Sequence, residues 1–409
     1  MIVSGGGYYS GLMQPLGAIL LALAAVILTG QILARALARV GQPPVVGEVL
    51  AGILLGPSLL GTDWSSVILP PSIAPTLGII AQLGVILYMF LVGVELETGK
   101  LASRGSSILI ISWASILVPF ALGAAIAPVL YEALAPAGVP FLSFTLFIGI
   151  AMSVTAFPVL ARILKDRGMD RTDIGVLAMS AAAIDDVTAW CLLALVVGVT
   201  QSQMAAGLSV AAWTIVFILA MVLVMRPLLA RVTRRDGKTS QCHVALTFVG
   251  LLLSALATEQ IGIHAIFGAF LFGAIIPHDS RIARELGTQL RGVVTVLLLP
   301  AFFAFTGMRT RLDLVSGAEA WLLCGLIVLV AVTGKFVGAV AGSRLAGLGW
   351  RDASVLGVLM NTRGLMELIV LNIGLELGVM SAPLFAMMVL MALITTLMTG
   401  PLLRISYKP

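Results

Sequence analysis

Long apolar runs with almost no charged residue dominate this sequence. A helix needs about 20 mostly apolar residues to cross the hydrocarbon core of a bilayer, and many of the runs reach that length. A soluble protein would instead show a polar face at helical spacing along each run. Only 11% of the residues are charged, against about 25% in a typical soluble domain. The chain is therefore expected to be an all-α integral membrane protein.

Segments long and apolar enough to cross a bilayer occur about thirteen times along the chain. They are residues 14–38, 43–60, 74–96, 105–131, 140–164, 172–200, 206–232, 241–258, 261–277, 287–307, 319–346, 351–376 and 380–404. We therefore predict about thirteen transmembrane helices joined by short loops.

The basic residues lie mainly in the short segments between these runs. If the amino terminus is outside, most of the 24 Lys and Arg residues fall on the inner side, among them Arg35, Lys165 and Arg231. Short loops rich in Lys and Arg remain in the cytoplasm. We predict a multi-pass protein of the cell (inner) membrane, with its amino terminus outside and its carboxyl terminus cytoplasmic. This charge pattern does not indicate a nucleic-acid partner.

Short matching stretches occupy corresponding positions in the two halves of the chain. The pairs are 47–57 with 268–277, 93–97 with 307–311, and 149–152 with 357–360. Gly52 is thereby matched with Gly273, and Gly93 with Gly307. Thirteen helices divide into six, one and six, so the two sets of six run in opposite orientations. We predict inverted six-helix repeats joined by a linker helix, an arrangement typical of secondary transporters with a site near the midplane.

Two adjacent carboxylates, Asp185 and Asp186, lie deep within the apolar segment 172–200. Charged residues at this depth are costly and are usually kept for a function. Lost hydration and mutual repulsion both favour the protonated state, so protons and cations would compete for the same oxygens. A site that holds either ion can exchange one for the other. The alternative is a structural pair, neutralised by protonation or by a neighbouring helix.

Lys335 also lies in the middle of an apolar segment, 319–346. It is too far from the segment ends for easy access to the membrane surface, although this remains the alternative. Burial disfavours the charged form of a lysine, whereas a nearby aspartate favours it. We expect Lys335 to pair with Asp185, which leaves Asp186 to bind the ion.

Polar residues interrupt two of the apolar segments. In the first, Pro158 has no amide proton and leaves the carbonyl of Val154 without its helical partner, beside the hydroxyls of Ser153 and Thr155. Carbonyls and hydroxyls are suitable ligands for small cations. Thr155 and Ser153 are therefore candidate ligands beside Asp186, with Thr155 and Asp186 expected to hold Na+ or K+. The alternative is a simple proline kink.

The second interruption comprises residues 361–364 and contains Arg363, which stays charged in proteins. Glu367 follows four residues later and is the local candidate partner on a helix. We expect Pro158, Asn361, Arg363 and Glu367 to have structural roles at two broken helices that cross.

These residues make the sequence similar to the monovalent cation/proton antiporter-2 family, which has the sodium/proton exchanger fold. The similarity covers nearly the whole chain and rests on residues 41–57, 153–162 and 361–372 and on the Asp185–Asp186 pair. It extends to plant cation/proton exchangers and to bacterial Kef-type and Na+/H+ antiporters. The resemblance implies that Asp186 binds the ion and that Asp185 and Lys335 are salt-bridge partners. It also implies elevator-type alternating access by a homodimer.

The resemblance further implies a division into domains. Residues 1–100 and 241–312 would form a dimerisation domain, residues 101–204 and 313–409 a mobile core, and residues 205–240 a linker helix. The partners would be monovalent cations, protons and the lipid bilayer, and no cofactor is expected.

The motifs leave the transported cation open. The Asp-Asp pair with a buried lysine resembles electrogenic Na+/H+ exchangers, whereas the surrounding motifs resemble potassium-handling members. Relatives of the potassium-efflux kind often carry Gln-Asp at this position, and many plant relatives carry Asn-Asp. We expect Na+/H+ exchange, with electroneutral K+/H+ exchange as the alternative. A sodium-coupled organic solute symporter is an alternative of another class, but it would need a larger polar cavity. The sequence has no nucleophile–base motif that would indicate an enzyme.

Overall fold

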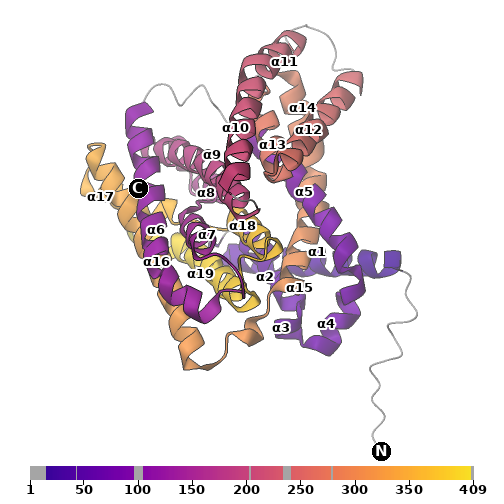
Figure 1. Cartoon of the computed structure of the whole chain (residues 1–409), viewed down its shortest axis with the longest axis vertical. Coiled ribbons are helices and arrows are strands. Elements are labelled where there is room, and N and C mark those ends of the chain that lie inside the picture. The colour runs from indigo at the N-terminus through magenta and orange to yellow at the C-terminus, as the bar shows by residue number, and fades with distance from the viewer. Residues whose placement is uncertain are drawn as a thin grey trace, which may run out of the picture. The chain divides into compact units, whose positions relative to one another are not determined.

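The computed structural model describes residues 15–42, 44–95, 105–201, 204–233, 241–277 and 280–406. All regular secondary structure in these ranges is helical (Figure 1). The α-helices are α1 (Pro15–Arg39), α2 (Pro44–Leu55), α3 (Pro57–Leu60), α4 (Thr62–Ile68), α5 (Ala74–Glu95), α6 (Gly105–Leu134), α7 (Phe141–Ser153), α8 (Phe157–Asp166), α9 (Asp173–Gln201), α10 (Met204–Ala220), α11 (Arg226–Thr233), α12 (Gln241–Ile261), α13 (Ala265–Ile275), α14 (Arg281–Val293), α15 (Leu299–Arg309), α16 (Gly317–Leu345), α17 (Trp350–Met360), α18 (Leu365–Glu376) and α19 (Ala382–Ser406). Short 3-10 helices, η1 (Pro71–Ile73) and η5 (Leu312–Leu314), and π-helical turns, η3 (Met221–Met225) and η4 (Val294–Leu298), complete the set.

Nine helical segments of the described ranges are long and apolar enough to cross a membrane, or ten if the bent pair α17–α18 counts as one span. The expected all-α membrane fold is therefore confirmed, but the count of thirteen is not. Several predicted spans form shorter helices: α2, α7 and α13 have 12, 13 and 11 residues. At 1.5 Å per residue, each is shorter than the hydrocarbon core of about 30 Å.

The chain forms two compact units. The first combines the described parts of Met1–Ala74, Leu101–Leu193 and Phe303–Pro409, and the second those of Pro75–Lys100 and Ala194–Phe302. In the first unit α1 packs on α2, α6 packs along α16, and α19 contacts α16, α17 and α18. In the second unit α12 packs on α13 and also contacts α10 and α14.

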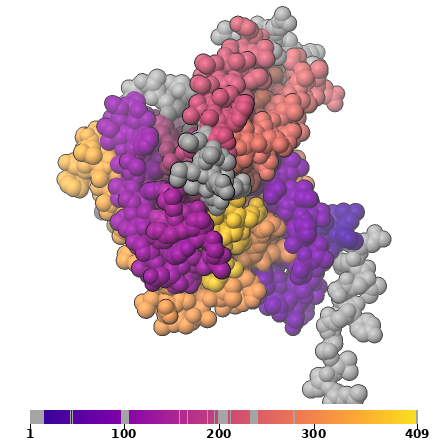
Figure 2. Space-filling model, in the orientation of Figure 1, coloured from indigo at the N-terminus to yellow at the C-terminus, as the bar shows by residue number. Residues whose placement is uncertain are grey.

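The near face of the first unit in Figure 2 is formed largely by α6 and the residues that follow it, coloured purple. The exposed side chains of α6 are mainly apolar and include Leu109, Trp113 and Leu117. Apolar side chains on the outside of a long helix are suited to contact with lipid, because no water is available there to solvate polar groups.

Small residues allow α16 and α6 to pack closely. Gly334, Gly338 and Gly342 recur every four residues and therefore share one face of α16. A Cβ atom would lie 2.9 Å from Pro119 Cα at Gly334 and 2.6 Å from the carbonyl oxygen of Ala114 at Gly338. Any side chain there would push the helices apart. This packing brings the middle of α16 close to the middle of α6.

In each unit a pair of glycines brings two helix backbones into contact. In the first unit, a Cβ at Gly307 of α15 would lie 1.9 Å from the carbonyl oxygen of Gly52 in α2. In the second unit, a Cβ at Gly273 of α13 would lie 2.2 Å from the carbonyl oxygen of Phe90 in α5, and Gly93 contacts α13 in the same way. Each crossing thus pairs a helix from one half of the sequence with a helix from the other.

Candidate functional site

Asp185 lies in the middle of α9 and is fully buried. Its carboxylate accepts hydrogen bonds from Ser112 Oγ at 2.6 Å, Ser115 Oγ at 2.7 Å and Thr155 Oγ1 at 3.0 Å. Lys335 Nζ lies 3.0 Å from Oδ2 of the same carboxylate. These donors come from α6, from the segment between α7 and α8, and from α16. They compensate the buried charge of Asp185, as buried carboxylates require.

Lys335 lies on α16, next to the glycine face that packs on α6, and is fully buried. Its ammonium group donates to the carbonyl oxygen of Ser115 at 2.9 Å as well as to Asp185. The structure therefore brings together Lys335 and Asp185, which we expected from the sequence to form a pair. Through these two hydrogen bonds, Lys335 links α16 to Ser115 of α6 and to Asp185 of α9.

Asp186 is also buried, with 2% of its surface exposed, but its surroundings are different. Neither carboxylate oxygen has a hydrogen-bond partner within the part of the chain that the structure describes. The backbone amide of Phe157, the first residue of α8, interacts with it electrostatically without forming a regular hydrogen bond. An unpaired buried carboxylate is unfavourable. Its two free oxygens are therefore suited to hold a proton or a cation.

The first helix break separates α7 from α8 and comprises residues 154–156. Val154 has an extended backbone, with φ of −64° and ψ of 135°, and the helix resumes at Phe157. Pro158 lies in the first turn of α8, where a missing amide proton costs no helical hydrogen bond. The position of the proline thus agrees with a helix that ends and restarts rather than one that only bends.

The two hydroxyl groups predicted as ligands at this break have different contacts. Thr155 Oγ1 donates to Asp185 and also lies 3.4 Å from the carbonyl oxygen of Met360 in α17. Ser153 Oγ instead lies 2.7 Å from the carbonyl oxygen of Gly149, one turn earlier on α7. The structure brings Thr155 to the aspartate pair, whereas the hydroxyl of Ser153 is directed to backbone carbonyls.

The second helix break comprises residues 361–364, between α17 and α18, which are bent by 47°. Gly364 has a φ of 154°, a conformation that residues with a side chain rarely adopt. Asn361 is buried, and its Oδ1 has no partner among the described residues. The amide of Ala156, from the first break, donates to the carbonyl oxygen of Thr362 at 3.0 Å. The two breaks therefore lie against each other.

Arg363 connects the second break to the end of α7. Its Nη1 donates to the carbonyl oxygen of Ala151 at 2.7 Å and to Glu367 Oε2 at 2.9 Å, and its Nη2 donates to the carbonyl oxygen of Met152. The last carbonyls of a helix lack intrahelical partners, and Arg363 supplies donors for two of them. Arg363 and Glu367 are both fully buried, and the arrangement supports the structural role expected for both.

Ser112 and Ser115 also belong to the site, although they are not among the residues predicted from the sequence. Their spacing of three residues places both on one face of α6, which is a signal that the sequence contains. The signal is weak, because serine in a membrane helix often donates to a carbonyl of its own helix. Only the position of Asp185 in space shows that these two hydroxyls form part of the site.

Comparison with known proteins supports a common origin over most of the chain. Residues 12–406 match the family described as "Sodium/hydrogen exchanger, transmembrane". The Na+/H+ antiporter NhaS4 of Synechocystis sp. is 43% identical over 373 residues, covering 89% of this chain and 91% of that protein. Cation/H+ antiporter 19 of Arabidopsis thaliana is 40% identical over 400 residues, or 96% of this chain. The chain spans about half the length of this plant relative, since the match covers 50% of it.

A solved structure shows the same fold. The sodium proton antiporter MjNhaP1 from Methanocaldococcus jannaschii, determined at pH 8, superposes with a TM-score of 0.70, covering 94% of this chain and 96% of the other. Sequence identity is only 14%, so this similarity concerns the fold alone. Because the family match extends over nearly the whole sequence, this chain is a multi-pass membrane protein that belongs to the sodium/hydrogen exchanger family.

Proposed function

We propose that this protein exchanges a monovalent cation, Na+ or K+, for protons across the membrane, with Asp186 carrying either ion. The observation that carries the proposal is the contrast between two adjacent carboxylates. Asp185 is hydrogen-bonded by four side chains, whereas the buried oxygens of Asp186 have no partner in the described part of the chain. Membership of the exchanger family supports the same function.

Protons and cations would compete directly for the oxygens of Asp186. Burial of the unpaired carboxylate disfavours the empty, charged form, so release of one ion is coupled to uptake of the other. Oxygen atoms from the two breaks would complete the coordination of the cation. Thr155 Oγ1 is such an atom, and the unpartnered Oδ1 of Asn361 is another candidate.

Lys335 would couple charge movement to exchange. Its ammonium interacts electrostatically with both aspartates and with Arg363. A cation bound at Asp186 would repel this ammonium and favour the release of its proton. If that proton leaves, two protons exchange for one cation and transport responds to voltage. If Lys335 keeps its proton, exchange is electroneutral, as expected for the K+/H+ alternative.

The proposed architecture has thirteen helices in two inverted repeats with a linker helix. The matched glycines support the repeat, because Gly52 contacts Gly307 in one unit while Gly273 and Gly93 cross in the other. Residues 1–100 and 241–312 would form the dimerisation domain, residues 101–204 and 313–409 the core, and residues 205–240 the linker. The core of each subunit of a homodimer would move by an elevator mechanism, with the amino terminus outside and the carboxyl terminus cytoplasmic.

Proton flux in proteoliposomes tests the site directly. Na+, K+ and Li+ gradients should each be compared side by side, and Asp186→Asn should reduce cation-driven pH change to the level of empty vesicles. Asp313→Asn is the matched control, because Asp313 is an exposed carboxylate paired with Arg311, and it should retain exchange. Undiminished exchange by Asp186→Asn would remove Asp186 as the ion carrier.

A further inference from the structure

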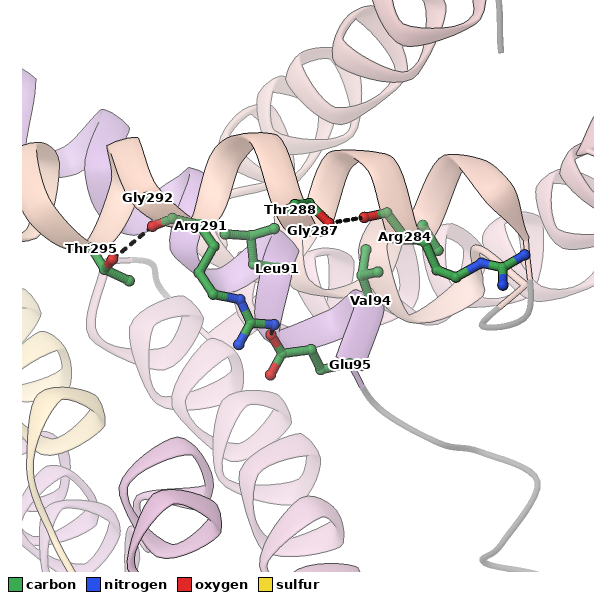
Figure 3. A pocket seen from close by; sticks show the side chains of 10 residues that line it. Leu91, Val94, Glu95, Arg284, Gly287, Thr288, Arg291, Gly292 and Thr295 are labelled. Atoms are coloured by element: carbon green, nitrogen blue, oxygen red, sulfur yellow. Dashed lines mark hydrogen bonds and ion pairs between the residues drawn. The ribbon is translucent and has the colours of Figure 1, made fainter. Parts of the chain in front are cut away.

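A groove of about 1040 Å³ lies in the second unit, between the end of α5 and the helical stretch α14–η4 (Figure 3). On the α5 side it is lined by Leu91, Val94 and Glu95. The lining residues of α14–η4 recur at intervals of three and four and include Arg284, Gly287, Thr288, Arg291, Gly292 and Thr295. They therefore form one stripe along the helix, and the stripe carries two guanidinium groups.

The groove carries an excess of positive charge. Arg291 Nη2 forms an ion pair with Glu95 Oε1 (Figure 3), and the other N–H groups of this guanidinium remain as donors. The Arg284 guanidinium has no acceptor among the described residues. Thr288 and Thr295 donate to the carbonyl oxygens of Arg284 and Arg291, at 2.8 and 2.7 Å. The two arginines are therefore the groups in the groove that can bind an anion.

The position of the groove along the membrane normal follows from helix lengths. On the α5 side, the groove lies at Glu95, the last described residue of the apolar span Pro71–Glu95. The span that begins with α14 covers 34 residues, Arg281–Leu314. At 1.5 Å per residue this is about 50 Å, whereas the hydrocarbon core is about 30 Å thick. α14 carries the charged residues Arg281, Arg284, Glu285 and Arg291, which are costly inside hydrocarbon, so we place this part of the long span in the layer of lipid head groups.

The stretch beyond the arginines is apolar and exposed. Val293, Val296 and Leu297 have exposed fractions of 52%, 51% and 43%. A soluble anion would not interact favourably with such a surface, whereas an acyl chain would pack against it. Basic pockets between membrane helices recognise anionic head groups, and arginine binds phosphate with two parallel hydrogen bonds. We propose that this groove binds an anionic phospholipid, with its phosphate between Arg284 and Arg291 and its acyl chains along η4.

Two glycines that line the groove face open space, so larger side chains introduced there can fill the groove. A Cβ atom at Gly287 or Gly292 would have no other atom within 4 Å. Larger side chains there should therefore occupy the lipid position without displacing protein atoms. Gly325 on α16 is equally open and provides a control for placing a large side chain on an exposed helix face.

Native mass spectrometry of the full chain in neutral detergent tests the charge requirement. Phosphatidylglycerol and phosphatidylcholine are added separately, and bound lipids are counted. We expect the wild-type chain to retain phosphatidylglycerol preferentially, and Arg284→Gln with Arg291→Gln to weaken it by about tenfold or more. Arg281→Gln is the matched control on the same helix, since Arg281 pairs with Glu285 at 3.6 Å outside the groove, and it should bind like the wild type.

Three results would overturn the proposal. The first is equal retention of phosphatidylglycerol by the wild type and by the double arginine variant. The second is full displacement of this lipid by inorganic phosphate, which would identify a soluble anion as the ligand. The third is a change of oligomeric mass without loss of lipid in the arginine variants, which would identify the groove as a contact with a second copy. Gly287→Leu with Gly292→Leu should reduce lipid binding, whereas Gly325→Leu should not.

Discussion

The two helix breaks occupy corresponding positions in the two halves of the chain but carry different chemistry. The first, at residues 154–156, contains no charged side chain and places the hydroxyl of Thr155 against Asp185. The second, at residues 361–364, contains Arg363, which reaches the carbonyls at the end of α7 and pairs with Glu367. The guanidinium group of Arg363 in the second break thus donates hydrogen bonds to the carbonyl groups that precede the first break.

The difference separates groups that hold the breaks together from groups that are available for ions. Arg363 and Glu367 compensate each other within one turn of the same helix. Asp185 and Lys335 compensate each other across helices, beside Asp186, whose oxygens remain without a partner in the described residues. We therefore expect mutations of Arg363 and Glu367 to act mainly on stability, and mutations around the first break to act mainly on transport.

The largest effect on stability is expected for Arg363→Met. It leaves Glu367 buried without its partner and removes the donors for the carbonyls of Ala151 and Met152. Removing one member of a buried ion pair costs about 3–5 kcal/mol. When the purified protein is unfolded in detergent by heat or by denaturant, its free energy of unfolding should fall by this amount.

A second substitution distinguishes an unpaired charge from a general loss of packing. Replacing both residues, as Arg363→Met with Glu367→Met, removes the uncompensated carboxylate and should recover part of the lost stability. A double variant as unstable as the sum of its single changes would mean that the two side chains do not act as a pair.

Lys335→Gln is expected to have an intermediate effect on stability and a specific effect on transport. Glutamine keeps a donor near Asp185, and three hydroxyl groups still bond that carboxylate. The loss of stability should therefore be about 1–3 kcal/mol. If the ammonium proton takes part in exchange, the variant should lose its response to voltage. Exchange rates measured under opposite imposed potentials test this, and an unchanged voltage response would exclude Lys335 as a proton carrier.

The sequence predicts the charged members of the site because they stand out against apolar surroundings. Asp185, Asp186, Lys335 and Arg363 each lie in a run where a charge is unfavourable. Neutral partners have no such contrast. Ser112 is one example, because a hydroxyl in a membrane helix is common and only the distance to Asp185 reveals its role.

Helix lengths are less predictable than helix positions. The segment 261–277 is predominantly apolar, but α13 begins only at Ala265. Gly262 has a φ of 95°, and the side chain of His264 caps the helix by accepting from the amide of Ile266. Hydropathy averages over such local features, so it predicts an apolar segment correctly but overestimates the length of its helix.

Thr155 and Ser153 give the finest test of the comparison, because Thr155 lies in the first break and Ser153 is the last residue of α7 before it. No helical periodicity relates residues on either side of a break, so the sequence does not reveal which hydroxyl faces the aspartates. Thr155→Val removes the donor to Asp185, and it should weaken the apparent cation affinity by about threefold to tenfold. Ser153→Ala removes a contact with the carbonyl of Gly149 and should change this affinity little. Half-maximal cation concentrations for exchange in proteoliposomes measure both, and equal effects of the two variants would contradict the assignment of Thr155 to the ion site.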